Sequence, residues 1–402
     1  MAIDSPARIA VLGAGPVGLE TALYARFLGY EVAVYERGRV AENVLRWGHA
    51  RMFSPFGQNR SALGLAALAA QDQSWQPPAD DALLTGNEWV ASYLGPLSQS
   101  DLLADSIRER TTVLAIGRDG LLRDDCEDRE LRGEPDLRLL IEDADGERFE
   151  TADAVIDATG NLGNPLWLGP GGLPAIGERE HRERIEYGLP DILGRDRPHY
   201  AGQRILVVGN GIFAAMNIVN LAELARAAPD TRVTWLTRAA DGVESPVQII
   251  ENDPLPARRE LAAAANRLAA DSQSPIAHWS GAAVERIRWK ADAQRFSVRL
   301  LNAPEEKLKV DRLVANVGWL PDNSLFRELR VQEIPASGTA PTTADSLLQP
   351  EPDFYILGTK SQGRHPQFLF SNALEQIRQL FTIIGDRPEL NLYATIGGVP
   401  RR

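Results

Sequence analysis

The sequence predicts an α/β fold in which one strand–turn–helix–strand plan occurs twice, with the second copy inserted into the first. Three observations support this. An apolar run that ends at Gly13 is followed, within about 30 residues, by a helix-like segment and a second apolar run. The same arrangement restarts at Gly209. Each copy is followed by a hairpin-like stretch and then by an Asp with a Gly seven residues later, at 153–160 and 311–318.

Length, charge and cysteine content restrict the number of domains, the classes of partner and the thiol chemistry. A chain of 402 residues suggests about two domains. The net charge of −12 argues against a nucleic-acid or anionic-membrane partner, since both require a concentrated positive surface. Cys126 is the only cysteine, which excludes an intrachain disulfide and a CxxC pair.

The sequence shows no sign of a targeting segment, a membrane span or a metal site. The N-terminal residues lack the charged-then-apolar pattern of a signal peptide. The longest apolar runs are far shorter than the roughly 20 residues that a bilayer span needs. The five histidines lack metal-ligand spacing. We therefore expect a soluble, cytoplasmic protein without a metal.

The first copy of the plan lies at the N-terminus. Residues 8–12 are apolar and predict a strand that ends at Gly13. Residues 15–28 have apolar side chains at roughly helical spacing, and Gly29 ends this predicted helix. Residues 31–36 predict the second, parallel strand, so this region is a βαβ unit.

The second copy repeats these elements. Residues 204–208 predict a strand, and the glycine turn at 209–214 leads into a helix over 214–228. Pro229 ends the helix, and residues 231–237 predict the next strand.

The last part of the chain completes the first domain. Residues 354–357 predict a further strand, and residues 371–384 a helix. The expected division is a discontinuous first domain of 1–165 with 325–402, a second domain of 200–320, and a Gly/Pro-rich linker over 166–199.

The first glycine turn suits a dinucleotide. Gly13 permits the tight bend, Gly15 lets backbone N–H groups approach a pyrophosphate, and Gly18 lets helix and strand pack closely. The phosphates would then lie at the positive end of the helix dipole. Glu36, at the end of the second strand, is placed to accept hydrogen bonds from an adenosine ribose.

The second turn differs from the first at the position that distinguishes NAD from NADP. Its letters are Gly209, Gly211 and Ala214, and the strand after its helix ends at Arg238 without an acidic residue. A carboxylate there would select the free 2′-hydroxyl of NAD, whereas an arginine can pair with the 2′-phosphate of NADP. We therefore expect NADPH, with NADH as the other option.

Together these residues resemble the two-dinucleotide-binding-domain flavoproteins, the superfamily of flavin-containing monooxygenases, N-hydroxylating monooxygenases and pyridine nucleotide-disulfide reductases. The resemblance implies two Rossmann-like, glutathione-reductase-type domains that bind FAD and NAD(P)H. The cofactor-binding residues that it implies are Gly13, Gly15, Pro16, Gly18, Glu36, Arg37, Ala158, Thr159, Gly160, Gly358 and Thr359 for FAD, and Gly209, Asn210, Gly211 and Arg238 for the nicotinamide nucleotide.

Two departures from the superfamily pattern affect the expected chemistry. Thr359 stands where the third FAD motif has an aspartate, so Lys360 or a backbone N–H group is the candidate substitute. The missing cysteine pair removes the thiol relay of the disulfide reductases. The segment 160–165 after the Ala-Thr-Gly motif is similar to that of the monooxygenase branch.

The resemblance therefore implies an FAD- and NADPH-dependent monooxygenase that hydroxylates an N or S atom of a small molecule with O₂, through a flavin C4a-hydroperoxide. Two alternatives stay open: an NAD(P)H:acceptor reductase that passes electrons to a quinone or a redox protein, and a non-catalytic flavoprotein sensor. A homodimer is also left open. The polar residues expected near the flavin are Arg51, Ser54, Asn59, Lys360 and His365.

Overall fold

The computed structural model describes residues 6–238, 245–332, 343–363 and 368–397. The chain forms two compact units, one of Met1–Asn164 with Leu320–Arg402 and the other of Pro165–Trp319. The chain thus enters and leaves the second unit once, and the second unit is inserted within the first. His365 lies outside the described residues.

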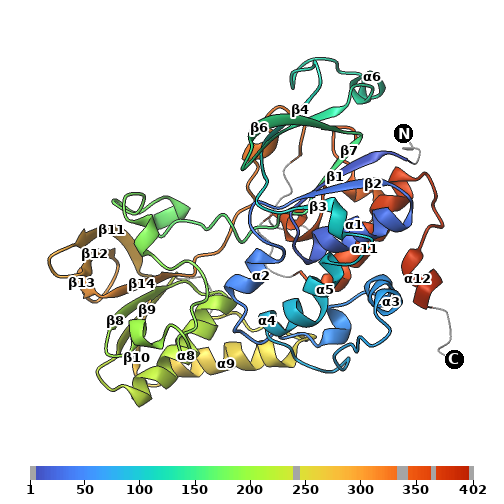
Figure 1. The fold of residues 1–402 in the computed structure, drawn as a ribbon. Helices are drawn as coiled ribbons and strands as arrows, with labels where there is room; N and C mark the ends of the chain where they lie inside the picture. The colour runs from blue at the N-terminus through green and yellow to red at the C-terminus, as the bar shows by residue number, and fades with distance from the viewer. Residues whose placement is uncertain (1–5, 239–244, 333–342, 364–367, 398–402) are drawn as a thin grey trace. The chain divides into compact units, whose positions relative to one another are not determined.

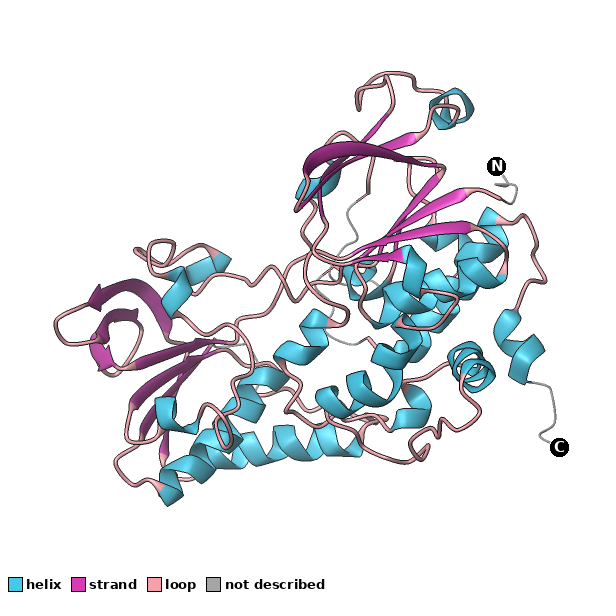
Figure 2. Cartoon of the chain, viewed as in Figure 1, coloured by secondary structure: helices cyan, strands magenta, loops and turns pink. Residues whose placement is uncertain are grey.

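The first unit is built on a parallel five-stranded sheet in the order β15–β7–β1–β2–β3 (Figures 1 and 2). Its strands are β1 (Arg8–Leu12), β2 (Glu31–Tyr35), β3 (Ile107–Arg108), β7 (Ala154–Asp157) and β15 (Phe354–Ile356). The three strands predicted for this domain from hydrophobic pattern alone near residues 8, 31 and 354 are present. β1 is central and almost wholly buried because the sheet is covered on both faces.

Helices cover one face of this sheet. α1 (Pro16–Phe27) and α11 (Phe370–Ile384) lie side by side there, and Tyr24 stacks on Phe381 with 5.0 Å between ring centroids (Figure 1). The remaining α-helices among the described residues of this unit are α2 (Glu42–Arg46), α3 (Ala62–Gln71), α4 (Gly86–Trp89), α5 (Gly95–Ser98), α6 (Arg129–Gly133), α10 (Ala344–Leu347) and α12 (Leu392–Gly397).

A three-stranded antiparallel sheet covers the other face. Its strands are β4 (Thr112–Arg118), β5 (Leu137–Asp143) and β6 (Gly146–Ala152). Successive side chains of β1 alternate between the two cores: Ile9 joins the core under the helices, and Ala10 joins the core under β4–β6. The predicted hairpin corresponds to β5 and β6, whereas β4 was not predicted.

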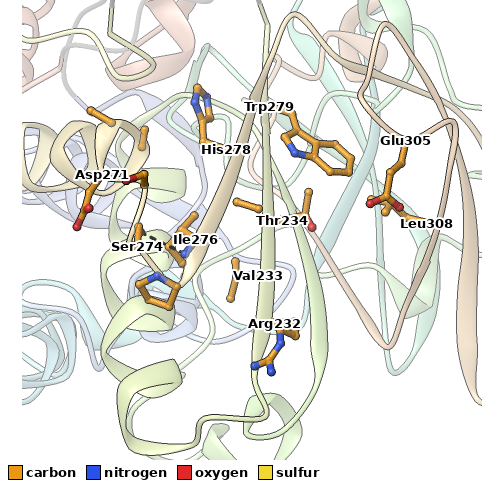
Figure 3. A pocket seen from close by; sticks show the side chains of 15 residues that line it. Arg232, Val233, Thr234, Asp271, Ser274, Ile276, His278, Trp279, Glu305 and Leu308 are labelled. Carbon is orange, nitrogen blue, oxygen red and sulfur yellow. Dashed lines mark hydrogen bonds between the residues drawn. The ribbon is translucent and has the colours of Figure 1, made fainter.

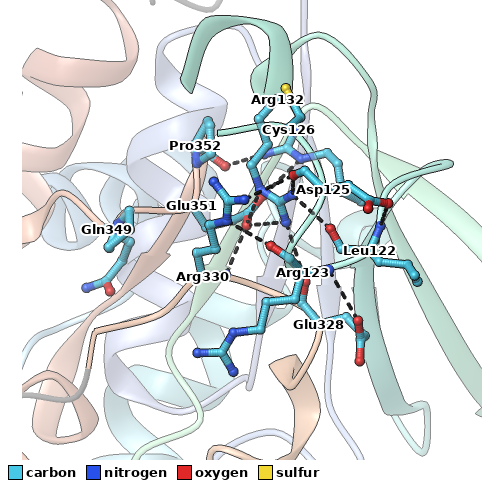
Figure 4. Close-up of polar contacts among 12 residues, drawn as sticks. Leu122, Arg123, Asp125, Cys126, Arg132, Glu328, Arg330, Gln349, Glu351 and Pro352 are labelled. Carbon is cyan, nitrogen blue, oxygen red and sulfur yellow. Dashed lines mark hydrogen bonds and ion pairs between the residues drawn. The ribbon is translucent and has the colours of Figure 1, made fainter. Parts of the chain in front are cut away.

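A buried ion cluster joins the end of β4 and helix α6 to the segment before β15 (Figure 4). Arg118 Nε lies 3.1 Å from Glu351 Oε1, and Arg132 Nε lies 2.9 Å from Glu351 Oε2. All three side chains are at most 1% exposed. Because two cations share one carboxylate and also bond to backbone carbonyls, the buried charges are paired rather than isolated.

The second unit contains a parallel four-stranded sheet in the order β10–β9–β8–β14. Its strands are β8 (Arg204–Val208), β9 (Arg232–Thr237), β10 (Ile276–Ser280) and β14 (Arg312–Ala315). Its helices are α7 (Arg197–Tyr200), α8 (Ile212–Ala227) and α9 (Pro256–Ala270), and its antiparallel sheet consists of β11 (Ala283–Lys290), β12 (Arg295–Leu301) and β13 (Lys307–Val310). The predicted βαβ unit is β8–α8–β9; α9, β10 and β11 were not predicted.

The segment 166–199, expected as a linker, lies within the second unit. Leu168 and Ala175 are buried in that unit's hydrophobic core. The wholly buried carboxylate of Glu178 accepts hydrogen bonds from Leu168 N at 3.0 Å, Ala175 N at 2.8 Å and the Tyr187 hydroxyl at 2.8 Å. A Gly/Pro-rich composition was therefore the wrong guide. Glu178 joins three parts of the segment to one another, and Ile176 and Glu186 pair with residues of the unit's strands.

Within the described ranges, no helix is long and apolar enough to cross a bilayer. In the same residues, no three His, Cys, Asp or Glu side chains are grouped as a metal site requires.

Candidate functional site

The first glycine turn needs glycine at three positions for three different reasons. Gly13 has a φ of +91°, and its N–H donates to Tyr35 O at 2.8 Å. A Cβ on Gly18 would overlap the carbonyl oxygen of Gly13, so this position permits the close approach of helix and turn. A Cβ on Gly15 would meet no atom within 4 Å, so the space above this residue is open.

That open space faces the N-terminus of α1. Gly15 is the residue that precedes the helix, and Pro16 is its first residue. Among the described side chains none caps this end, and the first turn holds no acidic residue. The first N–H groups of the helix and its positive dipole end are thus available to an anion such as a phosphate.

Glu36 links the turn to the end of β2. Its Oε2 accepts from Ala14 N at 2.9 Å, and its Oε1 accepts from Gly38 N at 2.8 Å. These bonds fix the carboxylate at the carboxyl edge of the sheet, and each oxygen keeps capacity for a further donor such as a ribose hydroxyl.

Arg37 is directed along the same edge, towards β7. A Cβ at Gly163 would clash with its guanidinium, so the Arg37 side chain lies directly over that glycine. Burial opposes the ionisation of nearby Asp322, but hydrogen bonds from Ser324 hold the pKa of this carboxyl below its usual range. The positive charges of Lys360 and Arg37 add to this effect.

Two further predicted motifs meet the glycine turn. A Cβ on Gly13 would lie 3.1 Å from Ala158 O and 3.1 Å from the Cα of Thr159, which follow β7. A Cβ on Gly358, just after β15, would lie 3.3 Å from a methyl carbon of Val17 in α1. Gly160 and Thr359 are neighbours as well, with Thr359 Oγ1 3.4 Å from the position of a Cβ on Gly160. The structure therefore brings all three motifs predicted for one cofactor to the carboxyl ends of β1, β7 and β15.

The Lys360 side chain is buried and bonded to protein groups. Its Nζ lies 2.5 Å from Asp157 Oδ2, donates to Asp322 O at 2.6 Å, and is 3.3 Å from Thr159 Oγ1. The side chain is 1% exposed. Asp157 Oδ1 in turn accepts from the N–H and hydroxyl of Thr159. The sequence predicts Lys360 as a polar group near the flavin and as a substitute for the missing aspartate; its charge is instead paired with Asp157.

The three polar residues predicted after β2 are only partly brought together. Asn59 Nδ2 donates to Ser54 Oγ at 2.8 Å and to Pro55 O at 2.9 Å, so Ser54 and Asn59 form one rigid group. Trp89 Nε1 donates to Asn59 O at 3.0 Å and holds this loop against α4. Arg51 is exposed and donates to the carbonyl of Leu83, away from that pair.

The second glycine turn repeats the geometry of the first. Gly209 has a φ of +132°, and a Cβ there would overlap the carbonyl of Asn316, beyond the end of β14. Gly211 precedes α8, and a Cβ on it would meet no atom within 4 Å. Among the described side chains none caps α8, whose first turn holds no acidic residue. Asn210, between the two glycines, is half-buried.

The end of β9 carries the predicted specificity residue and one that sequence reasoning missed. Arg238 follows β9 directly and its side chain is exposed. Trp235 is fully buried, and its Nε1 donates to Gly209 O at 2.8 Å, so the indole holds the glycine turn in place. The His278 ring contacts Trp235 in a tilted arrangement, with 5.0 Å between ring centroids, and burial lowers the pKa of this imidazole. A tryptophan one strand away from a glycine turn gives no local sequence signal.

A separate cavity of about 510 Å³ lies in the second unit beside β9 and β10 (Figure 3). Its walls include Arg232 and Ile276, the first residues of β9 and β10, together with Trp279 and Leu308. None of the glycine-turn residues lines it. It is therefore distinct from the edge formed by Gly209 and Arg238.

No protein-family model matches this sequence, and a comparison with curated proteins finds no match. Solved structures do match over nearly the whole chain. Bacillithiol disulfide reductase from Bacillus cereus is 18% identical, with a TM-score of 0.64 over 95% of this chain and 99% of that one. The FAD-bound cadaverine monooxygenase of desferrioxamine biosynthesis from Erwinia amylovora is 14% identical, with a TM-score of 0.63 over 96% and 95%.

A third similar structure is ornithine N-hydroxylase from Kutzneria, solved with reduced FAD, NADP⁺ and L-ornithine. It is 16% identical, with a TM-score of 0.60 over 95% of this chain and 99% of that one. At such identities the likeness concerns the fold, and it confirms both the predicted fold class and the resemblance. This chain has the two-Rossmann-domain α/β fold of the FAD-dependent, pyridine nucleotide-disulfide oxidoreductase-like proteins.

Proposed function

We propose that this chain is an FAD-dependent oxidoreductase that takes its electrons from NADPH and hydroxylates an N or S atom of a small molecule with O₂. The observation that carries the proposal is the repeated turn geometry. Gly15 and Gly211 each precede an uncapped helix end and leave open space above the backbone. Both turns therefore fit the pyrophosphate of a dinucleotide.

In the first unit, the residues around the open space fit FAD. The N–H groups of the turn at Gly15 and Pro16 would hold the pyrophosphate, and Glu36 would accept from the adenosine ribose. Arg37 places a positive charge along the same edge. The turns at Ala158–Gly160 and Gly358–Thr359 would border the flavin half of the cofactor.

In the second unit, Gly209–Gly211 would hold the pyrophosphate of the nicotinamide nucleotide. Arg238 is exposed at the end of β9, and the described residues at this end, up to position 238, include no acid that could select a ribose hydroxyl. A guanidinium pairs strongly with a phosphate, so this end of the site favours NADPH over NADH.

Bound FAD would supply the redox chemistry, because it accepts hydride from a nicotinamide and passes electrons onward. The protein's own residues would position the cofactors and shape the substrate pocket. The rigid Ser54–Asn59 pair is proposed to lie near the flavin, since its hydrogen-bonding groups suit a preorganised site. His365, outside the described residues, is proposed from the sequence alone. Arg51 is a weaker proposal because its guanidinium is directed to Leu83.

Hydroxylation is favoured over thiol chemistry by the cysteine content. Cys126, the chain's only cysteine, donates to Asp128 O in the loop after β4, so no cysteine pair exists to relay electrons. Two of the three similar structures described above are N-hydroxylating or amine monooxygenases by name.

An NAD(P)H:acceptor reductase is the second candidate. The observation in its favour is the likeness to bacillithiol disulfide reductase, which covers 95% of this chain. In that case electrons would leave FAD for a quinone, a redox protein or a thiol compound supplied from outside. A sensor with a decayed second site is less well supported, because Gly211 keeps the same open geometry as Gly15.

The test begins with the purified chain saturated with FAD. We expect NADPH to bleach the flavin absorbance anaerobically, and faster than NADH does. Oxygen uptake is then measured with a panel of primary amines and thioethers. A monooxygenase gives one hydroxylated product per O₂ and per NADPH for at least one compound. Rapid reduction of dyes or quinones without any hydroxylated product would instead support the reductase, and no reduction by either nucleotide would contradict both.

A further inference from the structure

The order of strands in the first unit sets the direction in which FAD would lie along the strand ends. This inference therefore rests on the proposed function. Glu36 follows β2, the open turn at Gly15 follows β1, Asn161 lies beyond β7, and Thr359 lies beyond β15. Neighbouring strands are about 5 Å apart. If the adenosine ribose lies at Glu36 and the pyrophosphate at Gly15, the next group of FAD along this edge is the ribityl chain, at β7 and β15.

Asn161 holds the last two turns together at this point. Its Nδ2 donates to Thr359 O at 3.3 Å and to Gly363 O at 3.2 Å. Both partners are carbonyl oxygens, so the nitrogen of the amide must face them and the oxygen must point elsewhere. Asn161 therefore closes the turn at 358–363 onto the loop after β7.

The oxygen of the same amide has no partner. Asn161 Oδ1 is inaccessible to solvent and accepts no hydrogen bond from any residue that the structure describes. Gln362, in the same turn, is 2% exposed, and neither of its amide atoms has a partner in the described chain. Buried polar groups are nearly always satisfied, so two such side chains, one in the loop after β7 and one in the turn at 358–363, indicate a missing ligand.

The chemistry of the unpaired atom restricts which part of the ligand it meets. A carboxamide oxygen only accepts hydrogen bonds, and so does an ionised pyrophosphate, so these two groups do not pair. Ribityl hydroxyls are donors. Thr359 occupies the position where the superfamily has an aspartate, and an aspartate would have been such an acceptor.

We propose that Asn161 Oδ1 accepts a hydrogen bond from a ribityl hydroxyl of FAD, and thereby supplies the acceptor that Thr359 lacks. Asn161 is thus a cofactor-binding residue on the flavin side of the pyrophosphate. Its nitrogen fixes the turn at 358–363 and its oxygen binds the ligand.

The test compares two ligands on the same variants. FAD contains the ribityl chain, and ADP has the adenosine and pyrophosphate groups without it. For Asn161→Ala we expect FAD affinity to fall about tenfold or more, as loss of one buried hydrogen bond predicts, while ADP affinity stays within about threefold. Both dissociation constants are measured on the full chain, by flavin fluorescence and by calorimetry.

The matched control is Asn164→Ala, three residues along the same loop. No side-chain hydrogen bond of Asn164 occurs among the described residues, and we expect both affinities to be unchanged. Asn161→Asp keeps an acceptor oxygen but cannot donate to both carbonyls. We expect it to lower the affinities for FAD and ADP together and to keep the wild-type ratio between them.

The outcomes separate this inference from the proposed function. Equal losses of FAD and ADP affinity in Asn161→Ala would mean that Asn161 only supports the loop, and would overturn the inference. Unchanged FAD affinity would also overturn it while leaving the proposed function intact. A wild-type chain that binds ADP but not FAD would contradict the proposed function itself. If Asn161→Ala does not fold, the FAD-to-ADP ratio in Asn161→Asp decides: a ratio well below that of the wild type overturns the inference.

Discussion

Lys360 and Asp157 form a buried ion pair, with 2.5 Å between Nζ and Oδ2 and at most 1% of either side chain exposed. The pair joins the turn after β15 to the end of β7, and Lys360 also reaches the backbone of Asp322. Three segments that are distant in sequence are therefore fixed at the edge where FAD is proposed to bind.

Lys360→Met should destabilise the chain without FAD. The substitution leaves Asp157 buried and unpaired, which costs about 3–5 kcal/mol for a pair of this kind. Thermal unfolding of the apoprotein measures the loss. The double variant Lys360→Met with Asp157→Asn should regain most of it, because no buried charge remains. A single variant with wild-type stability and lost activity would instead restore the catalytic role predicted for Lys360.

Gly15→Ala should weaken FAD binding with little effect on folding, whereas Gly18→Ala should destabilise the fold itself. Gly15 has a φ of −78° and open space at its Cβ, so alanine should change apoprotein stability by less than about 1 kcal/mol. It should lower FAD affinity by at least about tenfold, because the added methyl group takes the space of the pyrophosphate. Alanine at 18 collides with Gly13 O and should destabilise the fold itself by about 1–3 kcal/mol.

The second unit offers the matched control for that pair. Gly211→Ala should weaken NADPH binding and leave FAD affinity unchanged, since the two turns belong to different units. Thermal melts and titrations with each ligand separate these effects. Wild-type FAD affinity in Gly15→Ala would show that the pyrophosphate does not lie on the first turn.

Arg238→Ala should raise KM for NADPH by about tenfold or more and KM for NADH by less than about threefold, because only NADPH carries the 2′-phosphate. Steady-state reduction with each nucleotide measures both values. Arg232→Ala, at the opposite end of β9, is the control and should change neither. Equal effects of Arg238→Ala on the two nucleotides would contradict the NADPH assignment.

Glu20 should make stability depend on pH near neutrality. This carboxyl is wholly buried in α1, and burial raises its pKa to about 7, although the nearby hydroxyls of Ser61 and Tyr393 limit the rise. Between the unfolded value of about 4.5 and pH 7 the folded chain binds more protons than the unfolded chain, so rising pH favours unfolding. The expected loss over that window is about 3 kcal/mol.

Glu20→Gln should remove this pH dependence and be the more stable protein at pH 8. Chemical denaturation at pH 5, 6, 7 and 8 gives the comparison. Glu31→Gln, at an exposed position in β2, should keep the wild-type profile. A wild-type stability that is flat from pH 5 to 8 would contradict the burial-raised pKa.

The glycine turns and Glu36 could be predicted from sequence because their requirements act over a few residues. A positive φ at Gly13 and a close approach at Gly18 both require glycine, so the turn appears in the sequence as glycines at a fixed spacing. The βαβ elements follow for the same reason, since apolar periodicity and helix breakers are local. The α/β fold class rested on this local information.

What sequence reasoning missed depends on distant partners. Lys360 was assigned to the ligand because its partner Asp157 lies 203 positions away. Trp235 looked like an ordinary strand residue, and its bond to Gly209 appears only once β8 and β9 are paired. The segment 166–199 was called a linker because composition does not reveal that Glu178 is buried and satisfied.

The strand order of the first unit also determines when this unit can complete its sheet during synthesis. β7, at Ala154–Asp157, pairs with β15, at Phe354–Ile356, and the whole second unit is synthesised between them. The edge that brings Asn161 to Thr359 therefore cannot form on the ribosome until the chain has grown past β15. Up to that point β7 lacks β15, one of its two neighbouring strands. Flavin supply during synthesis should thus affect the yield of the first unit late, after the whole second unit has been synthesised.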